Sequence, residues 1–165
     1  MKRVHIIGGK NHGKTTLVTE LIAEFQSRGM RVGTIKHTHH QHELDTPGKD
    51  SYRHREAGAE VVGILSSSMN AVFWPKNEPK SPESGDERYR GFAPAFADCD
   101  LVLVEGDTRT SAPKLEVWRA VNDTPPIADR LTDIRLIVTD DPIQTAVPIL
   151  ARANVAAIAD FILED

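Results

Sequence analysis

Short apolar runs alternate with amphipathic stretches along the first part of the chain. The run Val4–Ile7 is followed by a segment in which apolar residues recur four positions apart from Leu17 to Phe25. This spacing predicts a buried strand and then a helix with one apolar stripe. Gly29 lies just beyond the last apolar position and marks the end of that helix.

The same alternation continues to the end of the chain. Apolar or alternating segments predict strands over residues 30–36, 60–65, 71–74, 100–106, 114–119 and 134–138. Helices are expected over residues 46–57, where Thr46 and Pro47 begin the helix, over about 88–97, and over 155–163, where Asn154 is the cap. Strands that alternate with helices indicate an α/β fold with a mostly parallel sheet. The polar alternation of residues 114–119 favours a strand near the sheet edge.

A glycine-rich motif joins the first predicted strand to the first predicted helix. Residues 8–15 match the pattern G-x-x-x-x-G-K-[ST], the phosphate-binding P-loop, in its proper strand–loop–helix context. Backbone N–H groups of such a loop converge on a phosphate, and the helix N-terminus adds its dipole. Lys14 is the candidate catalytic residue, since it would reach the β- and γ-phosphates, and the Thr15 hydroxyl would hold Mg²⁺. The residues expected to contact the nucleotide are Gly8, Gly9, Lys10, Asn11, His12, Gly13, Lys14, Thr15 and Thr16.

The motif and the pattern together predict a P-loop NTPase three-layer sandwich with a mostly parallel sheet. The chain has 165 residues, which fits one nucleotide-binding domain over residues 1–165. Within it, residues 75–87 hold three prolines and many charges, and we expect a mobile loop there.

Composition narrows the class of protein. The net charge of −4 and the pI near 6.0 argue against a nucleic-acid binder. Cys99 is the only cysteine, so no intrachain disulfide forms and a reducing compartment is indicated. No apolar run approaches membrane-spanning length, so we expect no membrane association and a cytoplasmic location.

Two carboxylates are candidate metal ligands. Glu105 ends an apolar strand, where the Walker B acid of a P-loop protein would face the Mg²⁺ held by Thr15; the alternative is an acid that merely ends a strand. Asp45 lies in the loop after the second strand, where switch regions contact metal and γ-phosphate. Its alternative role is turn chemistry.

Two further features remain open. Four histidines fall within His37–His42, which invites a Zn²⁺ or Ni²⁺ site, although phosphate contact or solvent exposure would also explain them. Thr139-Asp140 resembles the end of the guanine-reading T-K-x-D pattern, with Asp140 as the acceptor for guanine N–H groups. The lysine of that pattern is absent, so a turn aspartate is an equal alternative.

Several segments together resemble one family, the MobB-type molybdopterin-guanine dinucleotide biosynthesis adaptor proteins. The resemblance covers nearly the whole chain, and the histidine-rich stretch joined to Pro-Gly-Lys-Asp-Ser is its most specific part. The chain departs from the family pattern at Asp107-Thr108, where many relatives carry Phe-Lys, and in the Pro75–Glu87 loop. The segments that carry the resemblance are residues 8–16, 35–40, 45–52, 55–59, 101–106 and 159–162.

The resemblance implies a homodimer that binds GTP with Mg²⁺ and hydrolyses it weakly at best. It also implies a role beside the guanylyltransferase that joins GMP to molybdopterin, with molybdopterin or its precursor as a second partner. No arginine lies in the P-loop, so we expect fewer than about one turnover per minute without an arginine finger. Two other functions use the same loop: a metal-delivery GTPase with the His37–His42 cluster, and a small-molecule kinase.

Overall fold

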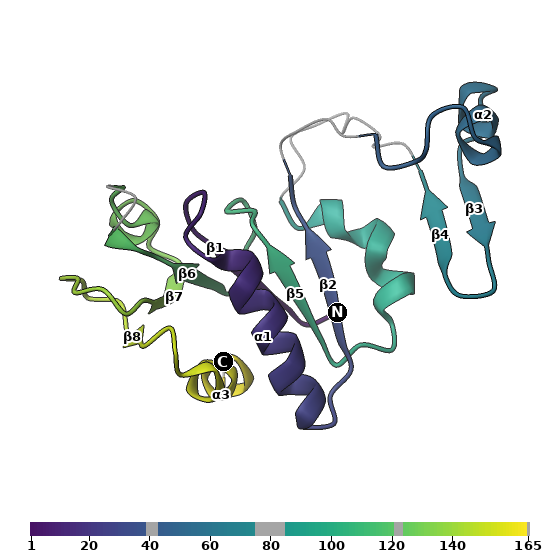
Figure 1. Cartoon of the computed structure of the whole chain (residues 1–165). Helices are drawn as coiled ribbons and strands as arrows, with labels where there is room; N and C mark the ends of the chain where they lie inside the picture. Colours follow the sequence, from purple (N-terminus) through teal and green to yellow (C-terminus); the bar gives the residue numbers. More distant parts are fainter. Residues whose placement is uncertain (39–42, 75–84, 121–123, 165) are drawn as a thin grey trace. The chain divides into compact units, whose positions relative to one another are not determined.

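The computed structural model describes residues 1–38, 43–74, 85–120 and 124–164 (Figure 1). The chain forms two compact units, one from Met1–Thr38 with Glu83–Asp165 and the other from His39–Pro82. The second unit is therefore an insertion in the sequence of the first. Most of the loop expected at residues 75–87 lies outside the described residues.

The first unit is built on a six-stranded sheet in the order β2-β5-β1-β6-β7-β8. Every pair of neighbouring strands in it is parallel, as the alternation of strands and helices predicted. The strands are β1 (Arg3–Ile7), β2 (Val32–Lys36), β5 (Leu101–Glu105), β6 (Lys114–Val117), β7 (Ile134–Val138) and β8 (Ile149–Leu150).

Helical segments cover both faces of this sheet. Helices α1 (Lys14–Ser27) and α3 (Val155–Glu164) pack on one face around the largest hydrophobic core, to which β1, β5, β6 and β7 all contribute (Figure 1). The 3₁₀ segment η1 (Glu87–Phe96) covers β2 and β5 on the other face, and η3 (Ile127–Asp129) belongs to a third core beside β7. The predicted three-layer sandwich is confirmed.

Strand β6 is where the sequence expectation was wrong. It lies between β1 and β7 rather than near an edge, and all four of its residues are buried. The alternating charges are hydrogen-bonded inside the fold: the Lys114 ammonium donates to the Thr110 carbonyl and to Asp133 Oδ2, both at 2.5 Å. Glu116 accepts the backbone N–H groups of Ile127 and Ala128 at 2.6 and 2.8 Å. Polar alternation thus marked partnered charges, not solvent exposure.

Other boundaries differ in detail. Asn154 caps α3 as predicted, since the Ala157 N–H donates to Asn154 Oδ1 at 3.2 Å. The predicted helix at Thr46 begins later, because residues 46–49 form a turn first. Strand β8 is only two residues long, too short to leave a periodic signal. None of the helices in the described part of the chain is both long and apolar enough to span a membrane.

The second unit, as far as it is described, holds helix α2 (Asp50–Glu56) and the strands β3 (Val62–Leu65) and β4 (Asn70–Phe73). The strands pair antiparallel as a β-hairpin, with Val62 opposite Phe73 and Leu65 opposite Asn70. Val62 is the one buried hydrophobic residue on them. Most of the hairpin's apolar surface is therefore exposed within the described unit.

Candidate functional site

The P-loop adopts a backbone that only a glycine-rich sequence allows. Gly8 has φ of 146° and Gly13 has φ of 94°, and Asn11 also lies at positive φ, 65°. A Cβ atom on Gly8 would stand 2.3 Å from the Val117 carbonyl oxygen, a backbone atom of β6 that has no room to yield. The glycine at this position is therefore required both by its dihedral angles and by the close approach of a central strand.

Lys14 opens α1 and points its side chain back across the loop. Its ammonium donates to the Gly9 carbonyl at 2.7 Å. The pKa of Lys14 lies below its ordinary value. Burial is the main cause, the nearby Glu105 carboxylate opposes it, and the nearby Lys36 ammonium adds to it. Among the described residues the Gly9 carbonyl is the hydrogen-bond acceptor of this ammonium, and a phosphate oxygen can replace it.

Thr15 and Glu105 meet at the carboxyl edge of the sheet. The Thr15 hydroxyl is 2.9 and 3.0 Å from the two carboxylate oxygens of Glu105. Strand β5 lies beside β1, so the end of β5 stands next to the start of the P-loop. A third side chain, which the sequence analysis did not single out, joins them: Lys36 Nζ lies 3.6 Å from Glu105 Oε1. The structure brings together two of the three residues expected to hold Mg²⁺, Thr15 and Glu105.

Asp45, the third candidate metal ligand, belongs to the second unit. Its side chain is 5% exposed, and its Oδ1 accepts the Thr46 N–H at 2.8 Å and the Ser51 hydroxyl at 2.9 Å. The Arg55 guanidinium lies 3.7 Å from Oδ2. These contacts fit the alternative role of Asp45, in which its carboxylate accepts hydrogen bonds within the turn that precedes α2. Metal binding by Asp45 stays a prediction.

His12 has a different position from its neighbours in the motif. Its ring is buried, accepts the Arg119 N–H at Nδ1 (3.2 Å) and contacts the Thr124 hydroxyl at Nε2 (3.0 Å). Burial, and secondarily the Lys14 ammonium, lower the pKa of His12, which favours the neutral ring that these two contacts require. The His12 side chain therefore braces the P-loop against the segment after β6. Any contact of His12 with a phosphate is left to its backbone.

The remaining predicted contacts lie at the same edge of the sheet. Lys10, Asn11 and Thr16 are exposed on the P-loop and the first turn of α1. Asp140 follows β7, and its Oδ1 accepts a long contact from the Ala153 N–H at 3.4 Å. Because β7 runs parallel to β6 and β6 to β1, Asp140 emerges at the sheet edge that carries the P-loop.

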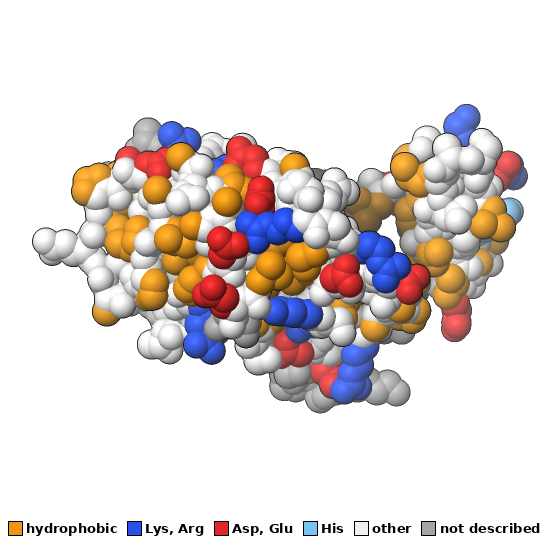
Figure 2. Space-filling model, turned by 90° about the horizontal axis from the view of Figure 1, so that it is seen from below, with side chains coloured by type: hydrophobic (Ala, Val, Ile, Leu, Met, Phe, Trp, Pro, Cys, Tyr) orange, Lys and Arg blue, Asp and Glu red, His pale blue; other side chains and the backbone are white. Residues whose placement is uncertain are grey.

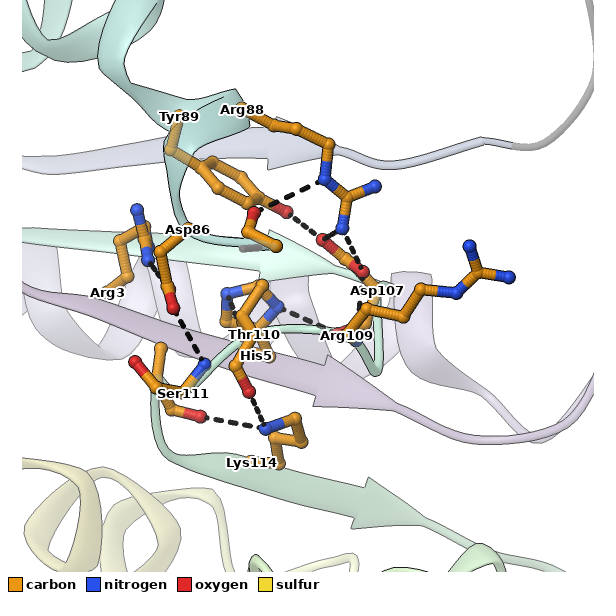
Figure 3. A network of polar contacts seen from close by, with 12 residues as sticks. Arg3, His5, Asp86, Arg88, Tyr89, Asp107, Arg109, Thr110, Ser111 and Lys114 are labelled. Carbon is orange, nitrogen blue, oxygen red and sulfur yellow. Dashed lines mark hydrogen bonds and ion pairs between the residues drawn. The ribbon is translucent and has the colours of Figure 1, made fainter. Parts of the chain in front are cut away.

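A buried polar network surrounds the loop that follows Glu105, and the sequence did not predict it (Figure 3). Its centre is Asp107, whose carboxylate accepts two contacts from one Arg88 nitrogen at 2.9 and 2.8 Å, and the Tyr89 hydroxyl at 2.7 Å. A second Arg88 nitrogen lies 3.2 Å from Nε2 of His37, the residue after β2. Burial alone would raise the pKa of Asp107, but hydrogen bonds from Tyr89 and the backbone, together with Arg88, hold it below its ordinary value.

His5 connects this network to β1. Its Nδ1 lies 3.1 and 3.0 Å from the carbonyls of Gly106 and Asp107, and Nε2 lies 3.3 Å from the Thr110 hydroxyl. Burial lowers the pKa of His5. Two elements therefore hold the loop after Glu105 in place: β1 through His5, and η1 through Arg88 and Tyr89. The network depends on contacts between segments that are distant in the chain, and no local sequence pattern predicts such contacts.

Two surface cavities lie elsewhere. One, of about 360 Å³, is lined by Arg3, Val4, Leu115 and Phe161, and its neighbour, of about 730 Å³, by residues such as Pro113 and Ile134. Both lie at the amino ends of the strands, where hydrophobic and charged side chains intermingle on the surface (Figure 2). Ligands of parallel sheets bind at the carboxyl ends. The geometry of the P-loop, rather than cavity size, therefore locates the candidate site.

The histidine cluster is only partly described. His37 lies within the described residues, whereas His39, His40 and His42 lie outside them. Among residues that the structure describes, no group of three or more His, Cys, Asp or Glu side chains is arranged to hold a metal ion. Because most of the cluster lies outside the described residues, the metal-delivery alternative stays open.

Comparisons with known proteins agree with one another. Residues 3–140 match the family described as "Molybdopterin guanine dinucleotide synthesis protein B", MobB. The chain is 34% identical over 155 residues to the molybdopterin-guanine dinucleotide biosynthesis adapter protein of Escherichia coli K12, which covers 92% of this chain and 86% of that protein. It is likewise 34% identical to the adapter protein of Haemophilus influenzae, over 95% of this chain and 85% of the relative.

Solved structures show the same fold. A crystal structure of molybdopterin-guanine biosynthesis protein B superposes with a TM-score of 0.69 at 25% identity, covering 98% of this chain and 97% of the other. The MobB of Bacillus subtilis superposes with a TM-score of 0.71 at 20% identity, covering 99% and 97%.

Proposed function

Because the chain belongs to the MobB family of molybdopterin-guanine dinucleotide biosynthesis adapter proteins, we propose that it binds GTP with Mg²⁺ and serves the guanylyltransferase that joins GMP to molybdopterin. In this function the protein binds GTP and presents it to the partner enzyme, and the partner enzyme performs the nucleotidyl transfer. Molybdopterin or its precursor is the second small molecule of the assembly. We also propose a cytoplasmic location, where such a partner and GTP meet.

The observation that carries the proposal is the contact between Thr15 and Glu105 at the start of α1. A hydroxyl and a carboxylate are the oxygen ligands that Mg²⁺ takes in nucleotide sites. They stand beside a loop whose Gly8 admits no side chain and whose Lys14 ammonium is held by one carbonyl. These residues fit a magnesium nucleotide, in which Mg²⁺ supplies positive charge to the phosphate oxygens.

For the base, we propose that Asp140 accepts guanine N–H groups. Its carboxylate is exposed and, among the described residues, accepts the long 3.4 Å contact from the Ala153 N–H. A carboxylate pairs with the two donors of guanine, whereas the same edge of adenine offers an acceptor instead. Equal competition by ATP and GTP for a labelled guanine nucleotide would contradict this assignment.

For the oligomeric state, we propose a homodimer that covers the β3–β4 hairpin. Leu65 is 88% exposed and Val72 54% exposed, and Val61 and Trp74 lie on the same exposed surface. In Figure 2 the second unit accordingly presents several hydrophobic side chains. An isolated two-stranded hairpin is marginally stable in water, so a second copy of the chain would supply the missing packing. Leu65→Asp should convert the dimer to monomer in analytical ultracentrifugation, and an unchanged dimer would refute this arrangement.

The test of the proposed function is nucleotide binding followed by partner capture. Among contacts of the described residues, Lys14→Ala removes the hydrogen bond to Gly9 and the attraction to Glu105, so the variant should stay folded and lose GTP binding in titration calorimetry. Wild-type protein should then retain a purified molybdopterin guanylyltransferase on a column. Unchanged GTP affinity in Lys14→Ala would refute the phosphate site, and absence of retention would refute the adapter role.

A further inference from the structure

Lys36 is paired with Glu105 by the register of the sheet. Strand β2 lies parallel to β5, and Lys36 stands directly opposite Glu105. Val32 on β2 and Leu103 on β5 pack into the core beneath α1. Side chains of a strand alternate between faces, so Lys36 and Glu105 lie on that same face. Both therefore project at the carboxyl edge toward the first turn of α1, which carries the phosphate-site residues.

The contacts place an excess of positive charge there. Lys36 Nζ lies 3.6 Å from Glu105 Oε1, while the Thr15 hydroxyl donates to the same carboxylate. The Glu105 carboxylate and the Lys36 ammonium both act electrostatically on Lys14, so the three charged groups are neighbours. One carboxylate thus stands between two lysines. The Lys36 side chain is 69% exposed and its stem is flexible, so it can change partners without disturbing the core.

We propose that Lys36 is a second phosphate-binding lysine, which pairs with Glu105 in the nucleotide-free protein and turns to the terminal phosphate of GTP once Glu105 engages Mg²⁺. The inference rests on the proposed function. Glu105 and Thr15 would hold Mg²⁺, which would supply positive charge to the phosphates, and a Glu105 carboxylate engaged in this way would leave the Lys36 ammonium available to a phosphate oxygen. GDP lacks the γ-phosphate, so Lys36 would discriminate between the two nucleotides.

The experiment compares two nucleotides on the full chain. Lys36→Met keeps an unbranched stem and removes the charge; Lys2→Met is the matched control, since Lys2 is an exposed lysine at the opposite end of the sheet. Titration calorimetry in Mg²⁺ should show about a tenfold loss of affinity for a non-hydrolysable GTP analogue in Lys36→Met, as expected for one charge-assisted contact. Affinity for GDP should change less than about twofold, and Lys2→Met should match wild type for both.

Each other outcome is decisive. An equal loss for the analogue and for GDP would overturn the assignment of Lys36 to the terminal phosphate. No loss for either, together with abolished binding in Lys14→Ala, would overturn the role of Lys36 and leave the proposed function standing. Unchanged binding in Lys14→Ala would refute the proposed function itself. Because Lys36 is largely exposed, unchanged thermal unfolding of Lys36→Met checks that the comparison concerns folded protein.

Discussion

The substitution Asp107→Asn tests the polar network behind Glu105. Asp107 has φ of 63°, a left-handed conformation that asparagine tolerates better than other side chains. Asparagine also keeps the size of the side chain, so neither the backbone nor the packing volume changes. The substitution therefore removes the charge and one acceptor and little else.

The magnitude follows from the contacts. The Asp107 side chain is 1% exposed; its Oδ1 can still accept the Arg109 N–H at 3.1 Å as an amide oxygen, but an NH₂ group in place of Oδ2 faces two donors, Tyr89 and Arg88. A hydrogen bond to a charged group contributes about 1.5–3 kcal/mol, so two would contribute about 3–6 kcal/mol. Arg88 is 30% exposed and regains some hydration, which reduces the expected loss to about 2–4 kcal/mol.

Urea unfolding at pH 7 measures this loss. The contribution is fully present there, because the pKa of Asp107 is lowered in the folded state; it is lost only as the pH falls below about 3.9. Glu87→Gln is the control: its ion pair with Arg90 is exposed, so the change should stay below about 0.5 kcal/mol. A double-mutant cycle with Arg88→Leu should give a coupling above about 1 kcal/mol. A loss below about 1 kcal/mol in Asp107→Asn, or no coupling, would refute the reasoning.

Three further substitutions test other parts of the site. Gly8→Ala should lower stability by at least about 2 kcal/mol and abolish GTP binding, because its Cβ meets the Val117 carbonyl; near-wild-type calorimetric titrations would contradict the loop geometry. Glu105→Gln should weaken GTP binding about tenfold in Mg²⁺ but less than twofold in EDTA, and equal losses in both would remove Glu105 from the metal site. Burial lowers the pKa of His5 from 6.5, so the unfolded chain binds more protons and stability should fall as the pH drops below 6.5. His5→Asn should reduce that fall by up to about 1 kcal/mol between pH 6.5 and 5.5 in urea titrations, and an unchanged pH dependence would contradict the assignment to His5.

The P-loop could be predicted because everything that defines it is local. A strand, two spaced glycines, a lysine and a helix occupy residues 3–27 without reference to the rest of the chain. The opposition of Lys36 and Glu105 could not be predicted, since it depends on which strands become neighbours. The same-face alternation of Val32, Thr34 and Lys36 was nevertheless a usable signal once β2 was known to pair with β5.

The polar network escaped prediction for a related reason. Asp107 follows Glu105 closely in the chain, but its partners Arg88 and Tyr89 come from η1 on the other face of the sheet. Nothing in the local pattern around any one of these residues indicates a buried carboxylate. The edge position expected for β6 was wrong because periodicity reports polarity, while burial depends on whether a distant partner, such as Asp133 for Lys114, is available.

The two buried charges of β6 also restrict how the sheet can assemble. Lys114 and Glu116 stand opposite His5 and Ile7 of β1, and in this alignment each has hydrogen-bond partners. Sliding β6 by one residue would exchange its faces, leaving an ammonium and a carboxylate in the apolar layer under α1 without partners. Misaligned sheets would therefore be strongly disfavoured during folding, although a purely aliphatic strand would tolerate them. The buried charges of β6 thus select the correct alignment of this strand. That alignment in turn sets the position of Val117 beside Gly8 of the P-loop.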